Sequence, residues 1–356
     1  DPAIVLGELQ PDLVVTGEGE ETVPGIIRGD DPGGLPNCAF LRGNELVVTR
    51  QKRVTDLSRP LPLIPGDIGS QDIRGAQTYI ETHRGCFGRC GFCQVPLSFG
   101  RQIRSRDPGE ILAEVRAFRE KGVRRIALIG GTGSLYRSKD GVLNEDAFID
   151  LLESLAAILG PKNVSCPDIR ADCITDRILD AVRTFSIGWI FFGIESGSPK
   201  ILDLMRKGIS PESVVSAVDR CREHGVRVAG SFITGYPGET EADHEMTRDL
   251  IDRISPDDVF ISPAEPIPTT PLADLVIRTP DSENPAFIPH TGEFGPLHLT
   301  ESEARAFDLM LHADSCRMNP RLTTDDLYQT YLQEVRRQGE EIRRATRLLL
   351  RYHRER

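Results

Sequence analysis

Apolar residues recur along the middle of the chain in two alternating patterns. Short runs that are apolar at nearly every position predict strands buried on both faces. Between these runs lie longer segments with apolar residues three or four positions apart, which predict helices with one buried face. The predicted strands cover residues 79–85, 124–131, 163–170, 188–195, 227–235 and 258–267. The predicted helices cover residues 107–122, 145–160, 175–185, 210–225 and 239–254.

This alternation predicts an α/β fold with a parallel sheet wrapped by helices. Right-handed crossovers would curl six such strands into a partial (β/α)6 barrel of the TIM type, which we place at residues 76–275. Residues 29–75 are rich in Gly, Pro and Asp and predict a linker with a short hairpin at "LRGNELVV". Residues 1–28 read as a strand, a turn and a helix start. Residues 276–356 read as a helical C-terminal extension.

Composition narrows the class of protein. The 356 residues carry a net charge of −11, which repels a polyanion and makes nucleic acid an unexpected partner. No apolar run is long enough for a transmembrane helix, and the start of the chain has no signal-peptide pattern. Five of the eight cysteines are isolated in the sequence, which is typical of a reducing compartment. We therefore expect a cytoplasmic protein without membrane contact.

The other three cysteines are clustered in "THRGCFGRCGFC", directly after the first predicted strand. Cys86, Cys90 and Cys93 are thus on a strand-end loop, where parallel α/β barrels carry their reactive groups. A structural zinc site normally has four ligands, and no fourth cysteine is nearby. Three thiolates favour a [4Fe–4S] cluster with one iron open to another ligand. A zinc loop that takes a ligand from elsewhere is the alternative. Phe92 is placed to lie against a planar ligand.

The cysteine spacing and its position on a six-strand barrel resemble the radical S-adenosylmethionine superfamily, over residues 77–270. The resemblance implies that the three cysteines hold the cluster and that the open iron binds the amino and carboxylate groups of S-adenosylmethionine. An external low-potential electron donor would then drive reductive cleavage of the sulfonium.

Two further strand ends match turns of that superfamily. Gly130 and Gly131 resemble the Gly-Gly-Glu turn whose backbone carbonyls receive the methionine amino group, although Thr132 replaces the glutamate. Arg170, in "PDIRAD", can bind a carboxylate through both arms of its guanidinium. An ordinary glycine turn and a surface Arg–Asp pair are the alternatives.

The last barrel strands supply two more expected contacts. Glu195 ends the fourth predicted strand and would accept ribose hydroxyls or the methionine ammonium group. Ser231, on the fifth predicted strand, would border the adenosine. A helix-capping role for Glu195 and plain turn chemistry at the later loops are the alternatives.

The segment "PDLVVTGEGEETV" (11–23) resembles the end of the Rossmann-like cobalamin-binding domain that precedes the barrel in one subgroup of the superfamily. On this resemblance, residues 1–28 are a remnant of that domain. Gly17, Glu18, Gly19 and Glu20 would border the cobalamin, because a glycine-rich turn after a strand permits close backbone approach. A short strand that caps the barrel edge is the alternative.

Cobalamin implies a methyltransferase that acts on an unactivated carbon after hydrogen abstraction by a 5′-deoxyadenosyl radical. The substrate would be a protein or peptide side chain, as for the similar archaeal enzyme that methylates a glutamine of methyl-coenzyme M reductase. A cobalamin-free radical enzyme, of the methylthiotransferase or oxidoreductase type, is one alternative. A non-catalytic iron–sulfur module is the other, and reductive cleavage of S-adenosylmethionine distinguishes it.

Overall fold

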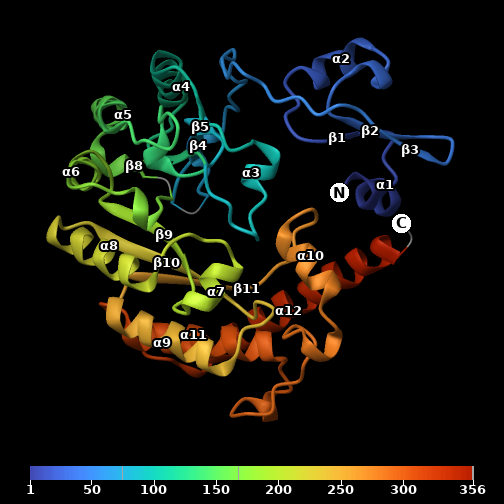
Figure 1. Cartoon of the computed structure of the whole chain (residues 1–356). Helices are drawn as coiled ribbons and strands as arrows, with labels where there is room; N and C mark the ends of the chain where they lie inside the picture. Colours follow the sequence, from blue (N-terminus) through green and yellow to red (C-terminus); the bar gives the residue numbers. More distant parts are fainter. Residues whose placement is uncertain (74, 167, 355–356) are drawn as a thin grey trace.

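The centre of the molecule is a set of six parallel strands arranged as two sheets of three (Figure 1). The computed structural model describes residues 1–73, 75–166 and 168–354. The first sheet contains β4 (Thr78–Glu81), β7 (Ile126–Ile129) and β8 (Val164–Ser165), in that order. The second contains β9 (Trp189–Glu195), β10 (Arg227–Thr234) and β11 (Asp258–Pro263).

A parallel bridge joins the two sheets. Ile169 pairs with Phe192, and the backbone N–H of Ile169 donates to the carbonyl of Phe191 at 3.0 Å. The six strands therefore follow one another in chain order from β4 to β11. Among the described residues no pairing joins β11 to β4, so the sheet is open. This arrangement confirms the predicted α/β class with a parallel sheet.

The predicted helices lie on the outside of the strands (Figure 1). They are α4 (Pro108–Glu120), α5 (Glu145–Leu159), α6 (Asp176–Phe185), α8 (Pro211–Glu223) and α9 (Glu241–Ile254). Each starts where the sequence provides a side-chain cap. The caps are Asp107, Asn144, Thr175, Ser210 and Thr240, each of which accepts a hydrogen bond from a backbone N–H of the first turn.

One large apolar core lies between these helices and the sheet. Ile80, Leu128 and Phe192 of the strands are packed in the same cluster as Val115 of α4 and Val182 of α6. All five side chains are at most 2% exposed. This packing holds the strands in place. Because the strands are parallel, the loops that follow them all lie at one edge of the sheet.

The third predicted strand is shorter than expected. The pattern over 163–170 predicts a full strand, but β8 has only two residues, and the chain continues to the bridge at Ile169. Residue 167 of this predicted strand lies outside the described residues. A further helix, α7 (Pro199–Leu204), follows β9 and was not predicted.

The N-terminal segment, residues 1–54, forms a small unit beside the barrel core (Figure 1). It contains α1 (Pro2–Leu9), β1 (Val14–Val15), α2 (Thr22–Arg28), β2 (Cys38–Arg42) and β3 (Glu45–Val48). The predicted hairpin is present, because β2 and β3 pair antiparallel with Arg42 opposite Glu45. The strand β1 also pairs antiparallel, with β2. A Rossmann-like origin of this segment stays a prediction.

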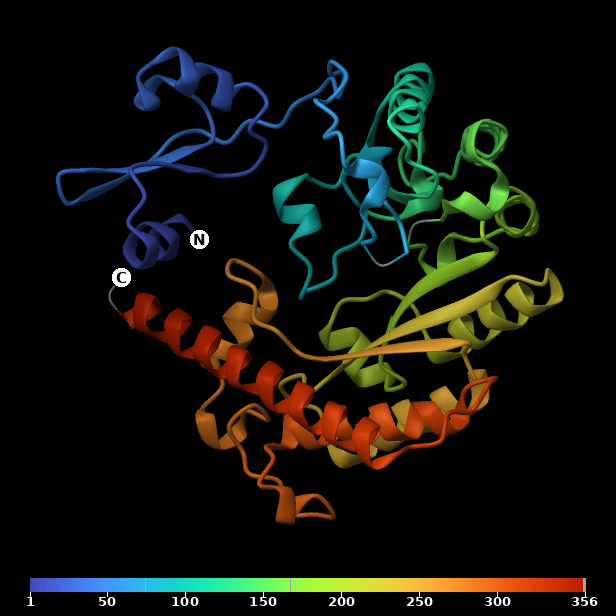
Figure 2. The same ribbon diagram turned by 180° about the vertical axis from the view of Figure 1, so that it is seen from behind.

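The C-terminal residues form two long helices that cover the second sheet (Figure 2). After α10 (Pro271–Arg278), α11 (Glu301–Cys316) packs against α12 (Asp325–Arg354) through Phe307 and Val335. The far end of α12 reaches α1, where Arg351 lies 2.8 Å from Glu8. The predicted boundary at 275/276 falls inside α10. In the described part of the chain, no helix is both long and apolar enough to cross a membrane.

Candidate active site

The three-cysteine loop is closed at its base by a short strand pair. β5 (His83–Arg84) pairs antiparallel with β6 (Arg104–Ser105), so residues 85–103 form a closed loop at the end of β4. Inside it, the Cys86 N–H donates to the Gly100 carbonyl at 3.2 Å, and the Cys93 N–H donates to the Cys90 carbonyl at 3.2 Å. Local backbone bonds therefore hold two of the three cysteines in place.

The three thiols are free and partly buried, and they lie close enough to influence one another's charge. A Cβ built on Gly88 would lie 3.3 Å from the Cys86 Sγ and 3.8 Å from the Cys90 Sγ, so both sulfurs face the same small space. Burial raises the pKa of Cys90 and Cys93, while the nearby Lys207 opposes that rise for both. Cationic neighbours favour thiolates, which is the form that binds iron. The donor set therefore fits the predicted cluster.

The predicted glycine turn lies directly against this loop. A Cβ on Gly131 would collide with the carbonyl oxygen of Gly85 and would lie 3.0 Å from the Cβ of Cys86. A Cβ on Gly130 would lie 2.5 Å from the Nδ1 of His83. Only glycine lets β7 end this close to the cysteines. Thr132 is buried beside them.

Arg170 also reaches the cysteine loop, but its guanidinium is already paired. Its Nε and one terminal nitrogen bind the two oxygens of Asp172 at 2.8 and 2.9 Å. The other terminal nitrogen lies 4.0 Å from the Cys90 Sγ, and the group lies over the Phe87 ring at 5.4 Å. Arg170 thus belongs to an Arg–Asp pair, but its side chain is buried and not on the surface, as the alternative had it. A substrate carboxylate would have to share the guanidinium with Asp172.

Glu195 and Ser231 meet at the same edge of the sheet. The Ser231 hydroxyl donates to one oxygen of Glu195 at 3.2 Å, and Lys207 binds the other oxygen at 2.6 Å. Glu195 has a φ of 72°, an uncommon conformation for a residue other than glycine and one that is frequent at functional sites. Lys207 lies over the ring of Phe92 at 5.8 Å. These contacts bring the end of β9, Ser231 of β10 and Lys207 together beside Phe92 of the cysteine loop.

Sequence reasoning missed three polar residues of this site. Lys207 follows α7 in the stretch "MRKG" and forms the buried ion pair with Glu195. Partial desolvation by its surroundings and the nearby Glu195 raise the pKa of Asp168, although the residue is exposed. His83 is 1% exposed, and burial lowers its pKa to about 4, so the ring is neutral at pH 7. The charged stretch "MRKG" was the one sequence signal available for Lys207.

Of the four predicted cobalamin contacts, Glu18 and Glu20 bind side chains of the barrel, whereas Gly17 faces open space. Glu18 is 4% exposed and binds Arg104, while Glu20 binds Arg84 at 2.5 Å. Gly17 has a φ of 103° and open space where a side chain would be. Contact between these residues, including Gly19, and a corrin stays a prediction.

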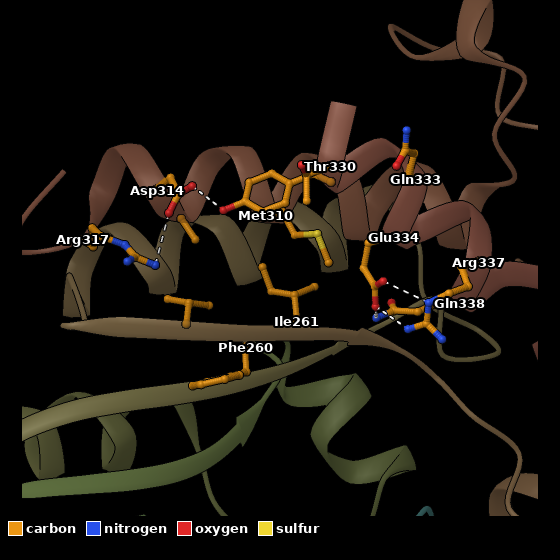
Figure 3. Close-up of a pocket in the computed structure, with 13 residues that line it drawn as sticks. Phe260, Ile261, Met310, Asp314, Arg317, Thr330, Gln333, Glu334, Arg337 and Gln338 are labelled. Atoms are coloured by element: carbon orange, nitrogen blue, oxygen red, sulfur yellow. Dashed lines mark hydrogen bonds and ion pairs between the residues drawn. The ribbon is translucent and has the colours of Figure 1, made fainter. Parts of the chain in front are cut away.

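Two other features of the molecule lie away from the cysteines. A cavity of about 590 Å³ lies between β11, α11 and α12, and Figure 3 shows the residues that line it. None of the predicted site residues lines it, and its charged groups pair with one another, as Arg317 does with Asp314 at 3.2 Å. It therefore offers little for binding a charged ligand.

The second feature is a group of metal-ligating side chains, Asp252, His312 and Cys316, on α9 and α11. The Nε2 of His312 lies 2.7 Å from Asp252, and Arg248 lies 3.4 Å from its Nδ1. Both ring nitrogens thus have partners in an ion pair between helices. That arrangement explains the cluster without a metal.

Comparison with known proteins places the described geometry in a family. The family model of the radical SAM superfamily matches residues 80–251. A protein of Methanocaldococcus jannaschii, provisionally named a methylthiotransferase, is 50% identical over 351 residues, which are 99% of this chain and 77% of that protein. A tRNA-2-methylthio-N(6)-dimethylallyladenosine synthase of Acidithiobacillus ferrooxidans is 34% identical over 58% of this chain. The match spans 47% of that synthase, about half its length.

Solved structures share the fold at low sequence identity. A radical S-adenosylmethionine methyltransferase of Kitasatospora setae, TsrM, covers 97% of this chain and 79% of its own at 15% identity, with a TM-score of 0.63. The cobalamin-dependent radical enzyme OxsB covers 96% of this chain and 47% of its own at 18% identity, with a TM-score of 0.58. Both matches include the N-terminal segment as well as the barrel strands, because they cover nearly the whole chain.

Proposed function

The chain belongs to the radical S-adenosylmethionine superfamily, and from this membership we propose that it is a cobalamin-dependent methyltransferase acting on an unactivated carbon. The observation that carries the enzyme class is the loop of three free thiols, brought together with Lys207 and Arg170 at the strand ends. The finer assignment to a methyltransferase is supported by "PDLVVTGEGEETV". It is also supported by the fold neighbours, which are a methyltransferase and a cobalamin-dependent enzyme.

Cys86, Cys90 and Cys93 would hold the [4Fe–4S] cluster, which supplies one electron for cleavage of the bound sulfonium. The residues of this chain then have binding and orienting roles. The carbonyls of Gly130 and Gly131 would receive the methionine amino group. Arg170, Glu195 and Ser231 would hold the remaining polar groups of S-adenosylmethionine.

Charge balance at the strand ends is part of this proposal. Glu195 is neutralised by Lys207 at 2.6 Å, so it accepts hydrogen bonds from ribose hydroxyls without leaving an unpaired charge in a buried site. Phe92 and Lys207 stack beside it and help to exclude water from the reacting groups. The methyl acceptor would be a protein or peptide side chain. An external low-potential donor would supply the electron.

The names of the sequence relatives favour a second candidate, a methylthiotransferase. Both candidates need the same cluster and the same S-adenosylmethionine site, so these features do not separate them. The two differ in the need for a corrin and in the atom transferred. A methylase adds carbon and hydrogen alone, whereas a methylthiotransferase also adds sulfur.

The experiment that tests the proposal is anaerobic turnover with a low-potential reductant, with and without hydroxocobalamin. We expect a stoichiometric corrin complex, cobalamin-dependent formation of S-adenosylhomocysteine and 5′-deoxyadenosine, and a product heavier by one CH2. A product that contains new sulfur, formed without a corrin, would establish the methylthiotransferase instead. The variant with Cys86, Cys90 and Cys93 all replaced by Ala should produce no 5′-deoxyadenosine. If it still does, the cluster assignment is wrong.

A further inference from the structure

A carboxylate of the N-terminal segment binds arginine side chains from both strands that close the cysteine loop. The side chain of Glu18 is fully enclosed. Its two oxygens bind the two terminal nitrogens of Arg104, at 2.5 and 2.8 Å. Arg84 approaches the same carboxylate at 3.8 Å. Arg84 lies in β5, two residues before Cys86, and Arg104 lies in β6.

Hydrogen bonds to two adjacent loop residues, Phe99 and Gly100, connect this carboxylate with the first cysteine. Arg104 also donates to the carbonyl of Phe99 at 2.7 Å. The next carbonyl, that of Gly100, accepts the Cys86 N–H at 3.2 Å. Because Arg104 binds Glu18 on one side and this loop backbone on the other, the position of Glu18 is coupled to the backbone that carries Cys86.

The end of the N-terminal segment makes a second, parallel contact with the same loop. The Val54 N–H donates to Glu18 at 2.6 Å, and the Val54 carbonyl accepts from Arg104. Arg53 donates to the Leu97 carbonyl at 3.1 Å. Two separate stretches of the N-terminal segment, near 18 and near 53, therefore hold residues 97–104 between them.

Because Glu18 is buried, its charge depends on the groups that bind it. Burial alone would raise the pKa of Glu18, but the bonds from Arg104 and Val54 outweigh it and hold the pKa below its ordinary value. The carboxylate is therefore charged at neutral pH. A buried charge without its partner is costly, so Glu18 and Arg104 are expected to be either both docked or both released to water.

We propose that Glu18 is a positioning residue for the cysteine loop, which it holds in a cluster-binding shape by docking the N-terminal segment on Arg104 and Arg84. This inference rests on the cluster proposed above. It gives the carboxylate a role toward the iron–sulfur loop and leaves the corrin to other groups. The exposed neighbour Glu20, paired only with Arg84, has a smaller part in the same contact.

The test compares Glu18→Gln with Glu21→Gln in the full chain. Both substitutions remove one carboxylate charge from the same turn, but Glu21 pairs with the exposed Lys52 of its own segment. After anaerobic reconstitution, we expect a chelator to remove iron about tenfold faster from Glu18→Gln, which corresponds to about 1.4 kcal/mol in the barrier. Glu21→Gln should release iron at the rate of the parent.

Hydrogen exchange separates local positioning from general destabilisation. In Glu18→Gln, faster exchange should be confined to residues 85–104 and the N-terminal segment, while α5 and α8 keep their protection. If the parent retains iron and Glu18→Gln releases it at the same rate, the positioning role is refuted. If the parent itself binds no iron, the proposed function fails instead. Equal loss of protection in α5 and α8 would also refute a local role.

A double-mutant cycle with Arg104→Gln identifies the partner. Because both side chains belong to one contact, Glu18→Gln with Arg104→Gln should release iron no faster than either single variant. Effects that add in full would refute the coupling. If Glu18→Gln does not fold, Arg104→Lys, which keeps the charge but loses the two-armed geometry, takes its place in the comparison and is expected to release iron faster than the parent.

Discussion

Gly131 shows how a missing side chain shapes the site. Its backbone touches the loop that carries Cys86, with the Gly85 carbonyl where a Cβ would be. The two nearest groups, the Gly85 carbonyl and the Cys86 Cβ, are not flexible ends of side chains, so neither can move away at low cost. β7 can therefore approach the cysteine loop this closely only because residue 131 has a hydrogen atom in place of a Cβ.

We expect Gly131→Ala to lower the free energy of unfolding by about 1–3 kcal/mol, because overpacking a closely packed site forces the backbone to shift. Denaturant unfolding of the reconstituted protein measures this loss, and titration with S-adenosylmethionine should show weaker binding. Gly66→Ala is the control, since Gly66 has open space and no positive φ. Equal stability of the two variants would contradict the packing argument.

Single residues of the site differ in how readily the sequence predicts them. The cysteines could be identified because all three lie within eight positions, and the glycine turn because it directly follows a strand. An aspartate partner for Arg170 was predictable, since Asp172 is only two positions away. The partners of Glu18 were not, because Arg104 lies 86 positions away and only the fold brings them together.

Helix α4 is attached to the barrel core by a buried ion pair. Glu114 binds Arg106 at 2.6 Å, and the two side chains are 5% and 1% exposed. Arg106 also donates to the Glu81 carbonyl at 3.0 Å, at the end of β4. The pair thus joins the helix to the strand from which the cysteine loop begins.

Replacement of Glu114 by Ala should cost about 3–5 kcal/mol of unfolding free energy, because it leaves the Arg106 charge buried without its acid. Thermal or denaturant unfolding measures the loss. Glu120→Ala, on an exposed position of the same helix, should change stability by less than about 0.5 kcal/mol. A small effect at Glu114 would mean that water solvates the Arg106 guanidinium in place of the lost carboxylate.

Elements were predictable where local signals and burial agreed. The predicted helices α4, α5, α6, α8 and α9 start at capping side chains that are visible in the sequence, as Asp107 and Thr240 are. The helix α1 was missed although Asp1 and Pro2 form a typical start, because its eight residues show little periodicity. The third strand was overextended because an apolar pattern predicts burial, and Ile169 is buried beyond β8 with an isolated bridge in place of a regular ladder.

At the scale of the whole molecule, the first and last helices meet. Ile4 of α1 and Leu349 of α12 belong to one apolar cluster with Ala273 of α10. Glu8 accepts from both Arg351 and Tyr352, at 2.8 and 3.1 Å. The N-terminal segment is therefore held at two places, by the cysteine loop and by the C-terminal helix.

We expect Ile4→Ala and Leu349→Ala each to destabilise the docking of α1 by about 2 kcal/mol, since each truncates a buried aliphatic side chain. The double variant should lose less than the sum, because both changes act on one cluster. Hydrogen exchange of the amides in α1 reports the docking directly. Leu322→Ala, at a position 90% exposed, is the control. Fully additive losses would mean that the two side chains stabilise separate contacts.

The meeting of α1 and α12 also bears on the order in which the protein assembles. Glu8 and Arg351 are 343 positions apart, so their contact closes a very long loop. A ribosome that synthesises the protein from its N-terminus releases α1 long before its partner exists. Glu18 meets Arg104 much sooner, because the two residues are only 86 positions apart. The N-terminal segment would thus be attached first at the cysteine loop, and α1 would wait, with its apolar side exposed, until α12 is made.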